Sequence, residues 1–154
     1  MRTVDRRIVR APAAAMFEAA ADVERWPEHL PHYRWVRFND RRADGGVVEM
    51  AAFRPFGPLA WPVWWESEMW IDAARREVRY RHVRGITRGM DVVWSVVPRG
   101  TNETEVTIVH TWEGPSWPLI RVPAAEWVIG PVFVHGIASR TLAGLARAVE
   151  ATHE

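Results

Sequence analysis

Hydrophobic and polar residues alternate along most of the chain, as is typical of β-strands with one buried face. The alternation is interrupted by turns rich in Gly, Pro, Asp and Asn, and it predicts strands over residues 4–10, 33–42, 47–54, 61–72, 77–84, 90–97 and 105–112. The last six follow one another at hairpin spacing. We therefore expect an antiparallel meander, broken by Pro and Gly at residues 55–58.

Two regions depart from this alternation and predict helices. Pro12 suits the first turn of a helix over residues 13–21, and residues 22–31 can hold only one or two turns because they contain two prolines. Residues 131–154 repeat apolar side chains at steps of three and four and predict a long helix, with Ile137 and Thr141 on its core face. The order indicates an α+β fold in one domain of residues 1–154. A long meander curls, so the helix would lie on its concave side and leave room for a small molecule.

Composition excludes several kinds of chemistry. The 154 residues carry 20 basic and 19 acidic side chains, and a net charge of +1 offers no basic surface for nucleic acid. Every basic residue is arginine and cysteine is absent, which excludes Schiff-base lysines, thiol nucleophiles and thiolate metal sites. His29 and His32 lack nearby carboxylates at metal-ligand spacing, and no cofactor motif is present, so we expect neither metal nor cofactor. Without a secretory signal or membrane-length apolar run, we expect a cytoplasmic protein with no transmembrane segment.

The most unusual feature is the presence of ten tryptophans. Strand alternation places Trp65, Ser67 and Met69 on one face, and it places Trp94 on the inner face of a later strand. These rings either line a ligand cavity or fill the core. The Pro- and Trp-rich stretches 55–65 and 114–127 could gate a cavity, cover one end of the sheet or form a homodimer contact.

His110 is the best single candidate for catalysis. Its alternation with Ile108 and Trp112 predicts an inner-face position. Imidazole suits proton removal from a carbon next to a carbonyl, because its ordinary pKa lies near neutrality. The alternative is a buried histidine whose hydrogen bonds are satisfied by a neighbour or by water. The faces of Arg79 and Arg81 are left open by the pattern.

Several segments resemble the START-like helix-grip superfamily, which includes the birch-pollen-allergen fold, and most closely its bacterial polyketide cyclase/aromatase/dehydrase group. They are residues 21–28 with Tyr33, residues 65–67 leading to 72–76, residues 89–94 and residues 104–112. The resemblance implies a curved antiparallel sheet of about seven strands around a long C-terminal helix. It also implies that a hydrophobic, aromatic or polyketide-like ligand binds in the cavity between them.

The resemblance implies roles for individual residues. The rings that line the cavity of aromatase relatives match Trp26, Tyr33, Trp65 and Trp94. Together with strand and helix faces, the candidate set is His110 and Tyr33 for catalysis, and Trp26, Trp65, Ser67, Met69, Trp94, Trp112, Ile137 and Thr141 for ligand contact. The relatives polarise a substrate carbonyl with an arginine at the position of Met69. Two functions therefore stay open: cyclisation and aromatisation by aldol and dehydration steps, or non-catalytic carriage or sensing of a lipid, sterol or quinone.

Overall fold

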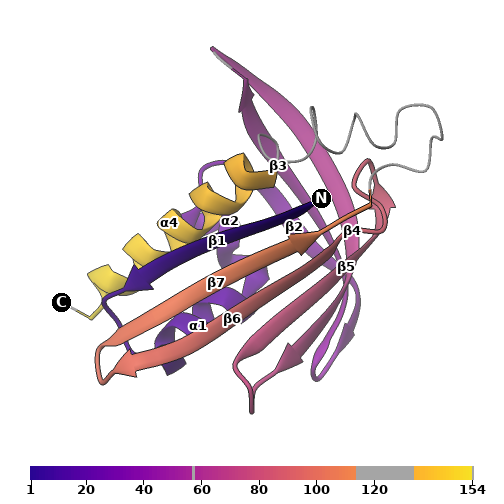
Figure 1. The fold of residues 1–154 in the computed structure, drawn as a ribbon. Helices are drawn as coiled ribbons and strands as arrows, with labels where there is room; N and C mark the ends of the chain where they lie inside the picture. Colours follow the sequence, from indigo (N-terminus) through magenta and orange to yellow (C-terminus); the bar gives the residue numbers. More distant parts are fainter. Residues whose placement is uncertain (57, 114–133, 154) are drawn as a thin grey trace.

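The computed structural model describes residues 1–56, 58–113 and 134–153 (Figure 1). Its strands are β1 (Arg2–Val9), β2 (Tyr33–Arg42), β3 (Gly45–Phe56), β4 (Leu59–Asp72), β5 (Glu77–Gly85), β6 (Asp91–Gly100) and β7 (Glu103–Thr111). Its helices are α1 (Ala13–Ala21), the 3₁₀-helix η1 (Val23–Arg25), α2 (Trp26–His29) and α4 (His135–Ala151). The predicted order of strands and helices is confirmed.

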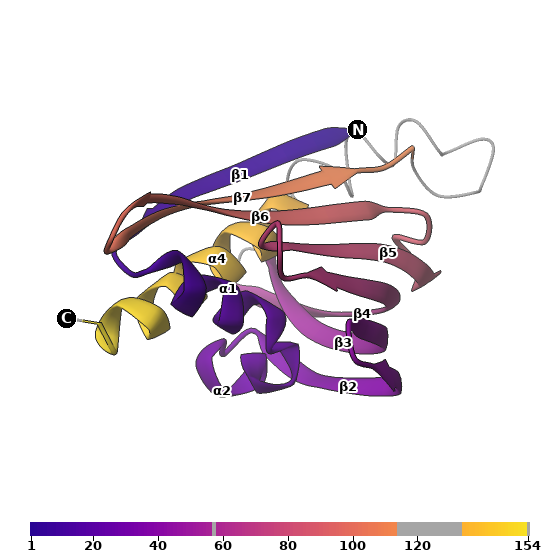
Figure 2. The ribbon, with the colours of Figure 1, turned by 90° about the horizontal axis from the view of Figure 1, so that it is seen from below.

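The seven strands form one antiparallel sheet in the order β1-β7-β6-β5-β4-β3-β2. The first strand pairs with the last, so that Thr3 lies opposite His110 and Asp5 lies opposite Ile108. Figure 1 and Figure 2 show the curved sheet with α4 along its concave side, where α1 and α2 also lie. The predicted α+β helix-grip fold is therefore confirmed.

The sequence predicts that residues 55–58 interrupt the meander. For β3 and β4, the strands on either side of this segment, that prediction is wrong. β3 and β4 remain paired to their ends, with Pro55 opposite Ala60 and Phe56 opposite Leu59. Proline lacks a backbone N–H and is tolerated where one edge of a strand is unpaired. The edge of β3 that faces β2 is unpaired at Pro55, because the pairing of β2 with β3 begins at Arg42–Gly45 and ends at Tyr33–Ala52.

The predicted C-terminal helix is shorter than expected at its end. Residues 131–133 and 154 lie outside the described residues, and α4 ends at Ala151. The Thr152 hydroxyl donates to the Val149 carbonyl at 2.9 Å and ends the helix by capping it with a side chain. Along α4, Thr141, Leu145 and Val149 are buried as predicted.

The hairpin between β2 and β3 depends on a glycine. Gly45 has a φ of +140°, and an added Cβ would collide with the main-chain oxygen of Met69 on the neighbouring strand. We therefore expect Gly45→Ala to lower the free energy of unfolding by about 2–3 kcal/mol, as measured by urea denaturation. The control is Gly100→Ala, because nothing lies within 4 Å of its added Cβ. Equal stability of the two variants would contradict this account.

Candidate functional site

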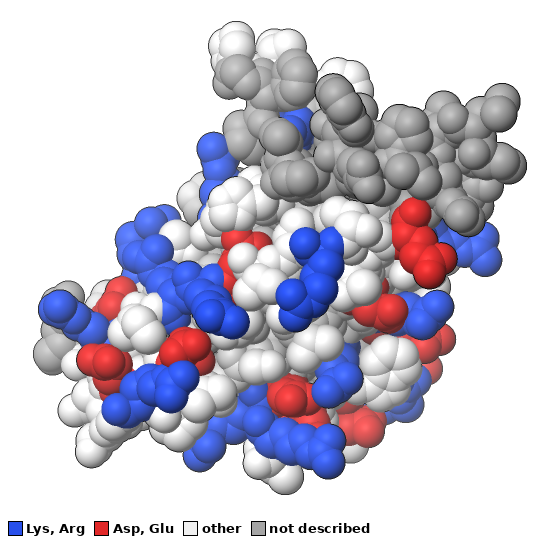
Figure 3. Space-filling model, viewed as in Figure 1, with Lys and Arg blue, Asp and Glu red and all other residues white. Residues whose placement is uncertain are grey.

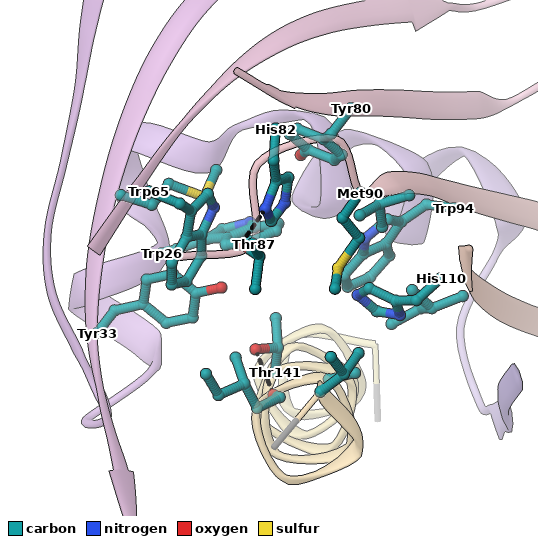
Figure 4. A pocket seen from close by; sticks show the side chains of 16 residues that line it. Trp26, Tyr33, Trp65, Tyr80, His82, Thr87, Met90, Trp94, His110 and Thr141 are labelled. Carbon is teal, nitrogen blue, oxygen red and sulfur yellow. Dashed lines mark hydrogen bonds between the residues drawn. The ribbon is translucent and has the colours of Figure 1, made fainter. Parts of the chain in front are cut away.

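A cavity lies between the concave face of the sheet and α4 (Figure 4). The sixteen described residues that line it are Trp26, Tyr33, Met50, Trp65, Tyr80, His82, Thr87, Met90, Val92, Trp94, Ile108, His110, Val134, Ile137, Ala138 and Thr141. About 70 Å³ is open to the centre of a water-sized sphere. One water needs roughly 10–15 Å³ by this measure, so the cavity has room for a small organic molecule.

A continuous series of aromatic rings forms one wall. The ring centroid of Trp26 lies 5.4 Å from that of Tyr33 and 5.5 Å from that of Trp94. Tyr33 meets Trp65 edge to face at 6.2 Å, and Trp65 stacks on His82 at 5.8 Å with an interplanar angle of 6°. Such pairs each contribute about 0.5–1.5 kcal/mol beyond area burial. The wall is therefore fixed by its own ring contacts.

Short helices and loops position these rings and the polar groups beside them. The Trp26 indole N–H donates to the Ala19 carbonyl at 3.1 Å, which ties α2 to α1. The Nδ1 atom of His82 lies 2.7 Å from the Thr87 hydroxyl, which the loop between β5 and β6 brings into the cavity. His82 and Thr87 therefore hold this loop against the wall.

The Thr141 hydroxyl links the cavity to a histidine behind it. This hydroxyl donates to the Ile137 carbonyl at 2.8 Å, and its oxygen lies 3.0 Å from Nε2 of His32. A hydroxyl has only one proton to donate. His32 must therefore donate through Nε2–H, which assigns its tautomer.

Burial keeps the titratable groups of the cavity uncharged. It lowers the pKa of His110 to about 4, and together with the nearby His110 it lowers the pKa of His82 to about 3. Burial also raises the pKa of the Tyr33 and Tyr80 phenols. At neutral pH these side chains are neutral donors and acceptors of hydrogen bonds.

The described lining contains no arginine, aspartate or glutamate. Charged groups lie outside instead, and Figure 3 shows basic and acidic side chains interspersed over the face that carries β1 and α4. Arg79 and Arg81, whose faces were left open, are exposed and pair with Glu77 at 2.8 Å and Asp91 at 3.5 Å. The cavity therefore suits a neutral ligand that carries a few hydrogen-bonding groups.

Most of the predicted site residues come together in the cavity. Those that line it are Trp26, Tyr33, Trp65, Trp94, His110, Ile137 and Thr141. Ser67, Met69 and Trp112 are buried but are not among the lining residues. The Trp112 indole instead donates to the Arg88 carbonyl at 3.0 Å. A ligand contact for these three stays a prediction.

Three polar residues of the cavity were missing from the predicted set. Tyr80 and His82 alternate with exposed arginines on β5. This alternation indicates that both side chains lie on the same face of the strand, but it does not indicate that this face is the inner one. Thr87 lies on a loop, where alternation gives no information about side-chain direction. All three lie within one strand and the loop that follows it, so what the sequence pattern left open was which way these side chains point.

Over residues 1–56, 58–113 and 134–153, no group of three His, Asp or Glu side chains is placed to hold a metal ion. No helix in the described part of the chain is long and apolar enough to cross a membrane.

Comparison with known proteins gives a family and a fold. The family model described as polyketide cyclase / dehydrase and lipid transport matches residues 9–133. No curated protein matches the chain. Among solved structures, the Zhui aromatase/cyclase from a Streptomyces species is 18% identical with a TM-score of 0.83, covering 100% of this chain and 96% of that one.

Two further structures show how widely the fold is shared. A START superfamily protein from Mycobacterium smegmatis is 19% identical with a TM-score of 0.68, covering 98% of this chain and 95% of that one. Norcoclaurine synthase from Thalictrum flavum, in complex with dopamine and hydroxybenzaldehyde, is 13% identical with a TM-score of 0.72, and the match covers 100% of this chain and 88% of that one. At these identities the likeness shows the fold alone.

Three histidines with lowered pKa values predict how stability depends on pH. The pKa of His32 is lowered to about 4 by burial and by Arg140, alongside those of His82 and His110. Unfolded histidines have a pKa near 6.5, so between about pH 6.5 and 4 the unfolded chain binds more protons than the folded one. From pH 7 to pH 4, His82 alone should therefore lower the free energy of unfolding by about 3 kcal/mol, with a further loss from His110 and a smaller one from the half-buried, solvent-screened His32.

Chemical denaturation at several pH values tests this dependence. His82→Asn should reduce the loss of stability on acidification, whereas the exposed His29→Asn should leave it unchanged. A pH dependence that is the same in wild type and His82→Asn would show that His82 does not carry it.

Proposed function

The chain belongs to the polyketide cyclase/dehydrase and lipid transport family, and from this premise we propose that it binds a neutral, ring-bearing hydrophobic molecule between its sheet and α4 and catalyses its cyclisation or aromatisation. The observation that carries this proposal is the cavity wall of contacting rings around Trp26, Tyr33 and Trp65. Flat rings offer large apolar contact to a flat ligand at little entropic cost.

His110 is the proposed general base. Its imidazole is neutral at pH 7 and can take a proton from a carbon next to a carbonyl. The electron pair left on that carbon attacks a second carbonyl and forms the new carbon–carbon bond. That carbonyl oxygen becomes a hydroxyl by taking the proton that His110 has just accepted. In the dehydration, His110 removes a second proton from the carbon between the new bond and the remaining carbonyl, the C–O bond of the hydroxyl breaks, and the hydroxide takes this proton and leaves as water, so that a carbon–carbon double bond forms.

Tyr33 is the proposed donor to the carbonyl under attack. Burial keeps its phenol protonated, and the phenol lies within the ring wall beside Trp26 and Trp65. A hydrogen bond there stabilises the negative charge that develops on oxygen. The apolar lining helps by excluding water from the reacting groups.

A second function is supported by a different observation. With no arginine in the described lining and an apolar Met69, a substrate carbonyl meets only neutral donors. Neutral hydrogen bonds are roughly half as strong as charge-assisted ones. This favours a carrier or sensor that holds a lipid, sterol or quinone without changing it.

Ligand binding can be tested by tryptophan fluorescence. We expect saturable one-to-one quenching by 1-naphthol, compared with a fatty acid, a sterol and a quinone. Trp94→Leu should weaken binding of the preferred class about tenfold, because it removes a ring from the wall. The control is Trp70→Leu, which alters a partly exposed tryptophan outside the lining. Absence of saturation by all four classes would refute the cavity proposal.

Catalysis can be separated from binding at His110. On an aromatic poly-β-ketone mimic, His110→Asn should lower turnover about 10²-fold or more while the Kd stays within roughly twofold. The wild-type rate should rise with pH through about 4 and stay level near neutrality, since the base is active when deprotonated. Binding without turnover, or turnover independent of His110, would favour the carrier or a different base.

A further inference from the structure

The Tyr80 hydroxyl is a polar atom of the cavity that the proposed reaction does not use. Tyr80 lies on β5, is 5% exposed and lines the cavity. Its hydroxyl oxygen is fully buried and has no hydrogen-bond partner among the described residues. A buried hydroxyl left unpaired costs free energy, so an additional molecule is expected to satisfy it.

The neighbouring side chains that the structure describes offer this hydroxyl no partner. Met69 lies directly opposite on β4 and is apolar. His82 lies two residues along the same face of β5. Its Nδ1 atom is 2.7 Å from the Thr87 hydroxyl and is therefore already in a hydrogen bond. Tyr33 contributes to the raised pKa of Tyr80, but no hydrogen bond joins the two phenols among the described contacts. The Tyr80 hydroxyl therefore has no hydrogen-bond partner among the described side chains.

The chemistry of the group indicates what it can recognise. Burial keeps the phenol protonated, so it donates one hydrogen bond and carries no charge. In Figure 4 it lies on the side of the cavity that carries His82, across from α4. A neutral donor at the end of an apolar cavity favours a ligand with an oxygen acceptor at one end.

On the basis of the proposed function, we infer that the Tyr80 hydroxyl donates a hydrogen bond to a carbonyl oxygen of the bound ligand and selects ring ketones over the corresponding hydrocarbons. Tyr80 is then a specificity-determining residue. The rival explanation is a buried water shared with Ser67, whose hydroxyl also lacks a partner among the described residues and whose strand position is opposite His82.

The test compares two compounds with the same two-ring skeleton, 1-tetralone with a carbonyl and tetralin without one. Calorimetry gives the Kd of each for wild type and for Tyr80→Phe, which removes only the hydroxyl. We expect wild type to bind the ketone more tightly than tetralin. In Tyr80→Phe the ratio of the two Kd values should fall about tenfold, because the ketone binds more weakly while the Kd of tetralin is unchanged.

Thr104→Val is the matched control, because it removes a buried hydroxyl that donates to the Ala11 carbonyl at 2.7 Å, away from the cavity lining. It should lower the melting temperature and leave the ketone preference intact. Tyr80→Phe should leave the melting temperature unchanged or raise it, because the hydroxyl has no partner among residues 1–56, 58–113 and 134–153 of the free protein.

The outcomes separate this inference from the proposed function. If both compounds bind and the preference is the same in wild type and Tyr80→Phe, the inference is overturned while the ligand cavity stands. A clear loss of melting temperature in Tyr80→Phe would also overturn it and favour the shared water. If neither compound binds wild type, the proposed ligand class is refuted, and the role of Tyr80 with it.

Discussion

Burial of the polar side chains between the sheet and α4 is the constraint on which the rest of the site depends. It lowers the pKa of His110 and raises that of Tyr80, so both are neutral. The same constraint makes an unpaired charge inside the cavity costly. Several charged groups lie on the other face of the sheet, where Glu49, itself 7% exposed, accepts hydrogen bonds from Arg37 at 2.8 Å and Asn39 at 2.7 Å. The curved sheet thus separates a charged exterior from a neutral cavity.

The strands could be predicted because their signal is local. Alternation with period two and turn residues are properties of short windows, and they defined the six-strand meander. Features that depend on distant partners were missed. Asp5 is buried although it lies in a charged segment, because it pairs with β7 and contacts His135 at the start of α4. Pro55 remains paired within a strand because β2 does not reach along its other edge.

The site was predictable to the extent that strand face determines it. Alternation and resemblance identified Trp65, Trp94 and His110, which line the cavity. The same rule chose Met69, which faces inward and is fully buried yet does not line it. The inner face of the sheet is larger than the cavity, because α1 also packs against β5, β6 and β7. Which inward residues meet the cavity is therefore decided by helix packing, which strand alternation does not report.

The base strength of His110 restricts the chemistry of the base role proposed for it. A base whose conjugate acid has a pKa of about 4 is always ready to accept a proton at pH 7, but it has little driving force to do so. It can act only on carbon acids that are already activated, such as a CH₂ group between two carbonyls. A neutral phenol donor at Tyr33 would lower that barrier further without introducing charge. A neutral cavity and a weak base are thus consistent with poly-β-ketone chemistry, and they argue against proton removal from a simple ketone.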